Sequence, residues 1–225
     1  MPLILPGNVA SATASTTYTV ANSCRFDGSS AKMQKTPGSD GNLKTWTFSA
    51  WIKKSVASTN QIFSAGVDAT DQFGIFFRDS IIIVGETSNT EYISLTTNAL
   101  YRDLSAWYHI VVAVDTTQGT NTNRVKLYVN GTQITSFSGT PVYPAEDTDT
   151  DVNRDIATSI GNRGWQDSQY FNGYMAEVCL IDGLALTPTS FGEFDEDSPT
   201  IWKPIDVSGL TFGTNGFYLD FEDSA

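Results

Sequence analysis

Histidine and cysteine are scarce in this chain of 225 residues, which holds one histidine and two cysteines. A single histidine argues against a zinc site built from several imidazoles. His109 is interpreted as a packed framework residue rather than as the base of a Ser-His-Asp or Cys-His mechanism. Cys24 and Cys179 lack zinc-motif spacing, so we interpret them as two buried thiols, with a single disulfide as the alternative.

Long apolar runs and positive charge are also in short supply. No run approaches the ~20 apolar residues that a membrane helix requires, so membrane insertion is not expected. The N-terminus has no basic stretch of the secretory type, and export would need another route, such as cell lysis. Thirteen basic residues against 25 acidic ones leave a formal charge of −12, which repels a phosphate backbone and excludes nucleic acid as a favoured partner.

The residues that are abundant describe a globular β protein. Hydrophobic residues make up 40% of the chain and charged residues only 17%, a composition that can bury a core. Many Thr, Ser, Asn and Gly residues suit short strands and tight turns. The length fits one large all-β domain, which we place at residues 23–225, after an extended N-terminal arm at residues 1–22.

The segment from Trp107 to Phe137 predicts three consecutive antiparallel strands. In its first strand, residues 107–115, both faces are apolar, so both should be covered. A second strand, residues 125–129, leads through Asn130-Gly131 into the third. Asn-Gly between alternating runs is the strongest short hairpin signal, because both residues tolerate the positive φ of a type I′ turn.

Alternation predicts further strands along the whole chain, and no amphipathic stretch of helical length interrupts them. They lie at residues 23–27, 46–54, 61–65, 72–78, 80–85, 91–96, 157–161, 170–182 and 217–221. Thr187-Pro188 indicates a single helical turn. We therefore expect an antiparallel sandwich with almost no helix. Its shared interior is expected to hold Trp46, Phe48, Trp107, Val111, Leu127 and Val178.

Several of these strands together resemble a known family. The order C-R-F-D-G, W-T-F-S-A-W-I-K, W-Y-H-I-V-V-A, V-K-L-Y-V-N-G and F-N-G-Y-M-A-E-V-C-L-I-D-G-L-A-L-T is similar to the laminin-G-like branch of the concanavalin A-like lectins and glucanases, over roughly residues 23–190. The resemblance implies a jelly-roll sandwich. MPLILPGNVASATA at the start, with LTPTSFGEFDEDSPTIWKP and GTNGFYLDF near the end, resembles structural proteins of marine bacteriophages. That likeness implies a capsid decoration, a head fibre or a tail fibre component on the virion surface.

The acidic segment 193–197 partly matches the Glu-x-Asp-x-Glu strand that laminarinase-type glycosidases of this fold carry. Its last position is Asp197, whose shorter side chain would widen the gap between the two carboxyl groups. The segment also follows a predicted turn, so we interpret it as a solvated acidic loop. The segment 218–222 lacks an acid at the first position. We therefore predict no catalytic residues and no enzyme.

Two segments could bind a ligand. The long polar loop after Gly139 carries acidic residues with the alternate spacing of a calcium loop, yet Val152 stands where an EF-hand needs Gly. An irregular calcium site or a solvated loop are the alternatives, and the candidate ligands are Glu146, Asp147, Asp149, Asp151 and Asp155. Between two later strands, Trp165, Asp167 and Tyr170 could stack on and hydrogen-bond a sugar. Core packing or a subunit contact is the alternative there.

The N-terminal arm has no charged side chain, and it holds apolar residues that the sandwich does not need for its own core. We predict that Leu3, Ile4, Leu5 and Val9 dock on other virion proteins, such as major capsid or tail proteins. Three functions remain open: a non-enzymatic virion surface protein that forms a homo-oligomer on the particle, an adhesin that binds host surface glycans, and a glycan hydrolase. The fold alone does not separate the first two.

Overall fold

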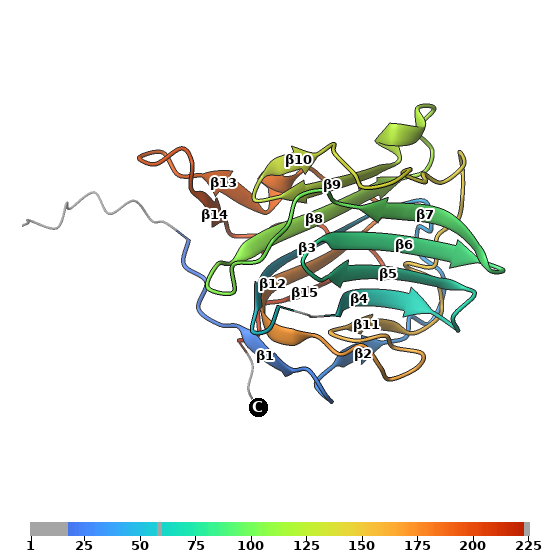
Figure 1. Cartoon of the computed structure of the whole chain (residues 1–225), viewed down its shortest axis with the longest axis horizontal. Coiled ribbons are helices and arrows are strands. Elements are labelled where there is room, and N and C mark those ends of the chain that lie inside the picture. The colour runs from blue at the N-terminus through green and yellow to red at the C-terminus, as the bar shows by residue number, and fades with distance from the viewer. Residues whose placement is uncertain (1–17, 58–59, 223–225) are drawn as a thin grey trace, which may run out of the picture.

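The computed structural model describes residues 18–57 and 60–222 and consists of two antiparallel sheets packed face to face (Figure 1). The seven-stranded sheet has the order β1 (Cys24–Asp27), β12 (Asn172–Asp182), β3 (Thr45–Lys54), β8 (Tyr108–Asp115), β9 (Val125–Val129) and β10 (Thr132–Ile134), with β15 (Phe217–Leu219) also paired to β12. The six-stranded sheet has the order β2 (Met33–Lys35), β11 (Thr158–Ile160), β4 (Gln61–Gly66), β5 (Gln72–Phe77), β6 (Ile81–Thr87) and β7 (Thr90–Thr96). The predicted all-β sandwich is confirmed.

A smaller hairpin is not paired with a strand of either sheet. Its strands are β13 (Gly192–Phe194) and β14 (Trp202–Pro204), and we call it the C-terminal hairpin. The described helices are the single turns η1 (Asn121–Asn123) and η2 (Pro188–Ser190). The second lies where Thr187-Pro188 predicted one. In residues 18–57 and 60–222, no helix has the length and hydrophobicity that a bilayer crossing requires.

The inter-sheet core is built from one face of each central strand. Trp46 and Phe48 of β3 meet Phe63 and Phe73 of the other sheet, with the Trp46 and Phe73 ring centroids 5.0 Å apart and the Phe48 and Phe63 centroids 4.7 Å apart. The Trp46 indole N–H donates to Thr150 Oγ1 at 2.9 Å, so this buried polar atom is satisfied. The β9–β10 turn is of the predicted kind, because Asn130 and Gly131 have φ of 47° and 77°.

The outer face of the seven-stranded sheet carries a second apolar cluster. Val111, Ala113 and Cys179 of the sheet pack there against Phe191 and Val207 of the C-terminal segment. This explains why β8 is apolar on both faces. It also corrects one expectation, because Val111 belongs to this outer cluster and not to the interior shared by Trp46, Leu127 and Val178.

Several local predictions need correction or refinement. Trp107 precedes β8 and is 36% exposed, so it is not a core residue. The acidic segment predicted to be a loop begins with strand β13, which holds Glu193 and Phe194. Strands β2, β13 and β14 were not predicted, because their three residues do not belong to a longer alternating run, unlike those of β11 and β15. Cys24 and Cys179 are both free thiols, the first half-buried and the second buried.

Residues 18–23, assigned by sequence mostly to the arm, lie against the seven-stranded sheet, and we call them the N-terminal strap. Tyr18, Val20 and Asn22 are half-buried, while the residues between them are exposed. This alternation is that of an extended chain with one face toward the domain. The arm residues Leu3, Ile4, Leu5 and Val9 lie outside the described residues.

Candidate functional site

Three nearly parallel rings lie on the outer face of the seven-stranded sheet. His109 of β8 is the direct cross-strand partner of Trp51 of β3, and the two rings stack with planes 19° apart and centroids at 4.8 Å. The plane of Trp202 of β14 is also 19° from that of His109, with centroids at 6.0 Å, and the two rings meet edge to edge through a hydrogen bond. The Trp202 ring occupies the space where a Cβ at Gly131 would lie, so the Asn-Gly turn is needed for packing as well as for its positive φ.

The hydrogen bonds of His109 define its tautomer. The Trp202 indole can only donate, and its Nε1 lies 2.9 Å from His109 Nδ1, so Nδ1 carries no proton. The proton is therefore on Nε2, which donates to Ser49 Oγ at 2.9 Å. Burial lowers the His109 pKa from 6.5 to about 3, so the imidazole stays neutral at physiological pH.

This tautomer is the opposite of the one that a serine nucleophile needs. A general base must receive the serine proton on its free nitrogen, whereas here Ser49 accepts a hydrogen bond from the imidazole. Ser49 is also only 1% exposed and out of reach of a substrate. The predicted framework role of His109 agrees with this geometry.

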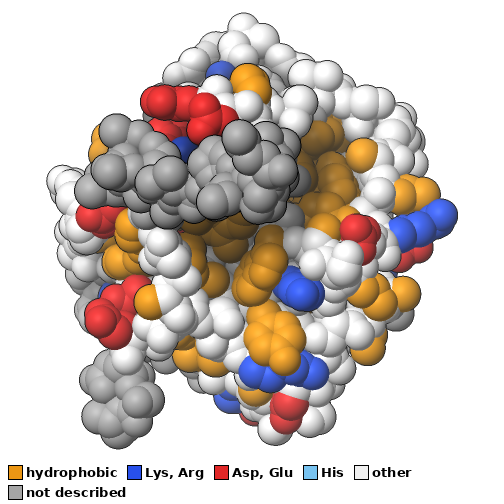
Figure 2. All heavy atoms as spheres, turned by 90° about the vertical axis from the view of Figure 1, so that its left-hand side faces the viewer, with side chains coloured by type: hydrophobic (Ala, Val, Ile, Leu, Met, Phe, Trp, Pro, Cys, Tyr) orange, Lys and Arg blue, Asp and Glu red, His pale blue; other side chains and the backbone are white. Residues whose placement is uncertain are grey.

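A cavity of about 300 Å³ opens beside Trp51, at the end of the sandwich that lies on the left in Figure 1. Figure 2 shows hydrophobic side chains gathered in a hollow at this end. Trp51 and Trp107 supply its aromatic surface, and Pro204 and Ala176 supply apolar walls. The N-terminal strap forms the remaining wall, through residues 20–23. We call this cavity the aromatic pocket.

The aromatic pocket has polar groups but no charge among the described residues that line it. Asn22 and Ser23 of the strap can donate and accept hydrogen bonds. The Trp51 indole N–H is buried and has no hydrogen-bond partner in the described part of the protein. A buried donor without a partner costs free energy, and a ligand that offers an acceptor would recover it.

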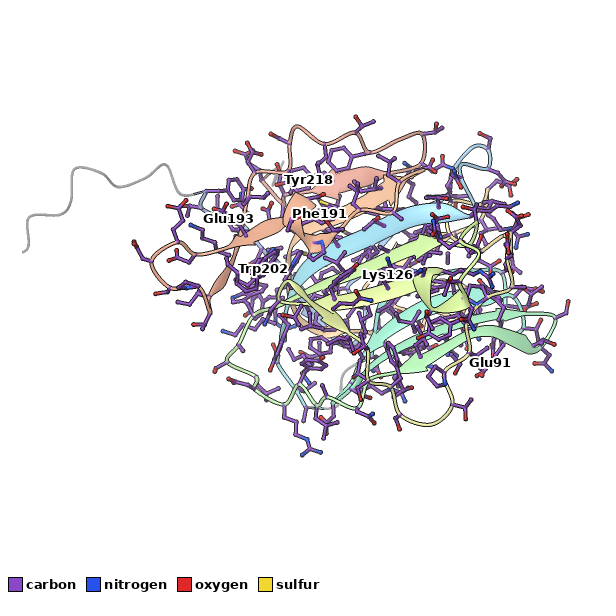
Figure 3. The ribbon with its side chains drawn as sticks, turned by 90° about the horizontal axis from the view of Figure 1, so that it is seen from above. Glu91, Lys126, Phe191, Glu193, Trp202 and Tyr218 are labelled. Atoms are coloured by element: carbon purple, nitrogen blue, oxygen red, sulfur yellow. The ribbon has the colours of Figure 1, made fainter. Side chains whose placement is uncertain are left out.

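A carboxylate anchors the strap next to the pocket. Glu177 Oε2 accepts hydrogen bonds from Tyr218 at 2.6 Å and from Tyr18 at 2.9 Å, and the two phenol oxygens are 3.2 Å apart. Burial raises the Glu177 pKa against the opposing effect of these two hydrogen bonds. Val20 packs onto Trp51, Ala176 and Trp202. Figure 3 shows Tyr218, Phe191 and Trp202 in the C-terminal part of the chain, on one side of the sheet.

The structure disperses the five predicted calcium ligands. Glu146 pairs with Arg124 at 3.3 Å, Asp147 with Lys44 at 3.2 Å, and the buried Asp151 with Arg154 at 2.6 Å. Asp149 and Asp155 are exposed. Among the described residues, no three His, Cys, Asp or Glu side chains are grouped so that they could share a metal ion. Calcium binding by this loop stays a prediction.

The predicted glycan residues lie in one turn, and two of their side chains are already engaged. Asp167 forms an ion pair with Lys32 and accepts a hydrogen bond from Asn162 at 3.2 Å. The Arg163 guanidinium lies over the Trp165 ring, 5.3 Å from its centroid. Tyr170 is half-buried. Arg163 therefore covers one face of the Trp165 ring.

Two carboxylates of the acidic segment on the C-terminal hairpin share one lysine. Lys203 of β14 pairs with Glu193 at 3.3 Å and with Asp195 at 3.4 Å. These carboxylates lie on the small hairpin and not on a strand of either large sheet. They therefore do not reproduce the catalytic strand of the hydrolases.

The family model described as the concanavalin A-like lectin/glucanases superfamily matches residues 27–190. The chain belongs to this superfamily. No curated protein matches the chain in sequence. Solved structures with the same fold come from different kinds of organism and share little sequence with the chain.

Three of these structures illustrate the range. The enzymatically active domain of tailspike protein 2 from bacteriophage CBA120 has 13% identity and a TM-score of 0.54, over 82% of this chain and 30% of that one. A SAP-like pentraxin from Limulus polyphemus has 14% identity and a TM-score of 0.52, over 73% and 77%. Domains LG4-5 of the mouse laminin α1 chain have 12% identity and a TM-score of 0.52, over 97% and 51%. The chain thus spans about half of the laminin fragment, and these likenesses establish the fold alone.

The superfamily member described here has a pocket that its sequence did not reveal. Its walls come from the strap, β3, the residue before β8, β12 and β14, which are far apart along the chain. One feature of the sequence did point to the site. Trp51 lies on the otherwise polar face of the strand at 46–54, where the core of the sandwich does not require an aromatic residue. The strap and Trp202 could be placed only by tertiary contacts.

Proposed function

We propose that the chain is a non-enzymatic surface protein of a bacteriophage particle and that its sandwich binds a glycan through the aromatic pocket. The virion assignment is supported by the likeness of the terminal segments to marine phage structural proteins. The fold shared with a phage tailspike is compatible with it. In this proposal the chain assembles with other virion proteins through its N-terminal segment and forms a homo-oligomer on the particle.

The observation that carries the glycan-binding role is the uncharged pocket with two indoles. The apolar C–H face of a sugar ring packs on an aromatic face, and its hydroxyl groups need donors and acceptors. Trp107 is 36% exposed at the rim, and Asn22 and the unpartnered Trp51 N–H lie beside it. This arrangement favours an adhesin over a purely structural decoration.

The lining of the same pocket supports the proposal that the glycan is not hydrolysed. Glycoside hydrolysis generally uses two carboxyl groups on either side of the scissile bond. Of the described residues that line the pocket, none is acidic. The only histidine is buried, neutral and hydrogen-bonded on both nitrogens. We therefore propose that the bound glycan is retained and not cleaved.

A binding experiment with a matched control tests this proposal. Purified protein is applied to an array of bacterial cell-surface polysaccharides, alongside Trp107→Ala and Trp165→Ala. Loss of a stacking tryptophan should weaken binding at least about tenfold in Trp107→Ala, with little change in Trp165→Ala. Reducing-sugar assays on the bound polysaccharide should show no release. No binding to any polysaccharide, or equal binding by Trp107→Ala, would reject the proposed site.

A further inference from the structure

The N-terminal strap forms one wall of the aromatic pocket. Side-chain contacts hold it in place, and it lies outside regular secondary structure. Residues 20–23 line the pocket, while residues 18–23 belong to no strand. Tyr18 reaches Glu177 with its hydroxyl group, and Val20 packs on Trp51. The pocket therefore has its full shape only while these contacts hold the strap.

The anchor for the strap is built into β12 by a β-bulge. Strand pairing between β12 and β3 shifts register between Ala176 and Cys179, and Glu177 has a φ of 50°. The extra residue lets Ala176 line the pocket while Val178 still faces the inter-sheet core. The carboxylate of Glu177 meets the strap and β15 on the outer side, since its partners are Tyr18 and Tyr218. Without the bulge, alternation would place Ala176 and Val178 on the same face of the sheet.

From these contacts we infer that Tyr18, Glu177 and Tyr218 form a latch, and that closing this latch sets the affinity of the aromatic pocket for its ligand. The inference rests on the proposed glycan-binding function. When the Tyr18 hydrogen bond is lost, the strap opens more often and the wall formed by residues 20–23 is lost with it. Ligand then binds only the latched fraction, so the apparent affinity falls in proportion.

The latch also connects the pocket to the rest of the N-terminal segment. Tyr18 follows directly on residues 1–17, which carry no charged side chain. A partner that binds this segment would restrain the strap next to the pocket. Attachment of the N-terminal segment and ligand binding are then coupled through one short stretch of chain, and each favours the other.

The test uses Tyr18→Phe in the full chain, which removes one hydroxyl group and keeps the ring. Tyr174→Phe is the matched control, because Tyr174 is 37% exposed on the same strand β12 and its ring contacts Arg25 rather than the strap. Hydrogen exchange with mass spectrometry reports on opening of residues 18–23. Affinity is measured for a polysaccharide that the wild-type protein binds on the array.

Loss of one net hydrogen bond should speed exchange of the strap amides about two- to tenfold. Polysaccharide binding should weaken by the factor by which the latched fraction, calculated from the exchange rates, falls. The melting temperature should stay nearly unchanged, since the strap is outside both cores. A fall in the latched fraction with unchanged affinity would overturn the coupling, and unchanged exchange would overturn the latch. If the wild-type protein binds no polysaccharide, the proposed function fails and the coupling with it, while the exchange data still decide whether the latch exists.

Discussion

Replacing Trp202 with Phe should destabilise the protein more than replacing Trp51 with Phe, although the two side chains flank the same imidazole. Both tryptophans are 8% exposed, so the two substitutions remove similar ring area from similar surroundings. Their hydrogen bonding differs: the Trp202 N–H donates to His109 Nδ1 at 2.9 Å, whereas the Trp51 N–H has no partner in the described structure. A buried acceptor left without its donor costs about 1 to 3 kcal/mol.

Urea unfolding of the two variants measures this difference. The midpoint for Trp202→Phe should lie below that of Trp51→Phe by an amount that corresponds to about 1 to 3 kcal/mol, with unchanged slopes. Equal midpoints, or a lower one for Trp51→Phe, would refute the assignment of this hydrogen bond.

The tautomer is open to a second assay, because the chain has only one histidine. Nitrogen-15 spectra of the imidazole should show the Nε2–H form with no titration between about pH 5 and 8.

Acid stability follows from the same site. The depressed His109 pKa means that the unfolded chain takes up a proton below pH 6.5 while the folded protein does not until about pH 3. Stability from this group is therefore complete above pH 6.5 and is lost as the pH falls through that window. Between pH 6.5 and pH 5 the loss is about 2 kcal/mol.

Three other perturbations test the rest of the structure. Leu127→Ala, in the inter-sheet core, should cost about 2 to 5 kcal/mol in denaturant unfolding, and a cost near zero would contradict its 1% exposure. Glu177→Gln should raise the melting temperature at neutral pH and lose this advantage in acid. The reason is that burial of the charged carboxylate is unfavourable, as its raised pKa shows, so the contribution of Glu177 to stability falls as the pH rises. A difference in melting temperature between variant and wild type that stays constant from pH 4 to 8 would contradict this. Deletion of residues 2–17 should leave the melting temperature of the domain unchanged while abolishing incorporation into phage particles, and normal incorporation would reject the predicted role of Leu3, Ile4, Leu5 and Val9.

Most of the fold could be predicted because its strands are long enough to show alternation. Strand β3 places Trp46, Phe48 and Ile52 on one face, and that face is the inter-sheet core. The apolar residues at 110–114 predicted that both faces of β8 are buried. They did not indicate which residues cover the outer face. The cover is Phe191 and Val207, which approach from the C-terminal segment through long-range contacts.

The candidate site was harder to predict because its partners are distant in sequence. The spacing of Asp147, Asp149 and Asp151 left a calcium site and a solvated loop as alternatives. In the structure, Lys44 and Arg154 pair individually with two of these side chains. Spacing within one loop cannot reveal a lysine that folds back from 103 residues away. The aromatic pocket was missed for the same reason, since it requires the strap and the C-terminal hairpin to converge on Trp51.

The central claim, that a glycan binds in the aromatic pocket, is tested most directly by tryptophan indole spectra during a titration. The five tryptophans give separate N–H signals, which single Trp→Phe variants assign. On addition of oligosaccharides prepared from a bound cell-surface polysaccharide, we expect the Trp51 and Trp107 signals to shift together and the Trp165 signal to stay in place. Shifts confined to Trp165, or saturating binding that leaves Trp51 and Trp107 unmoved, would contradict the account.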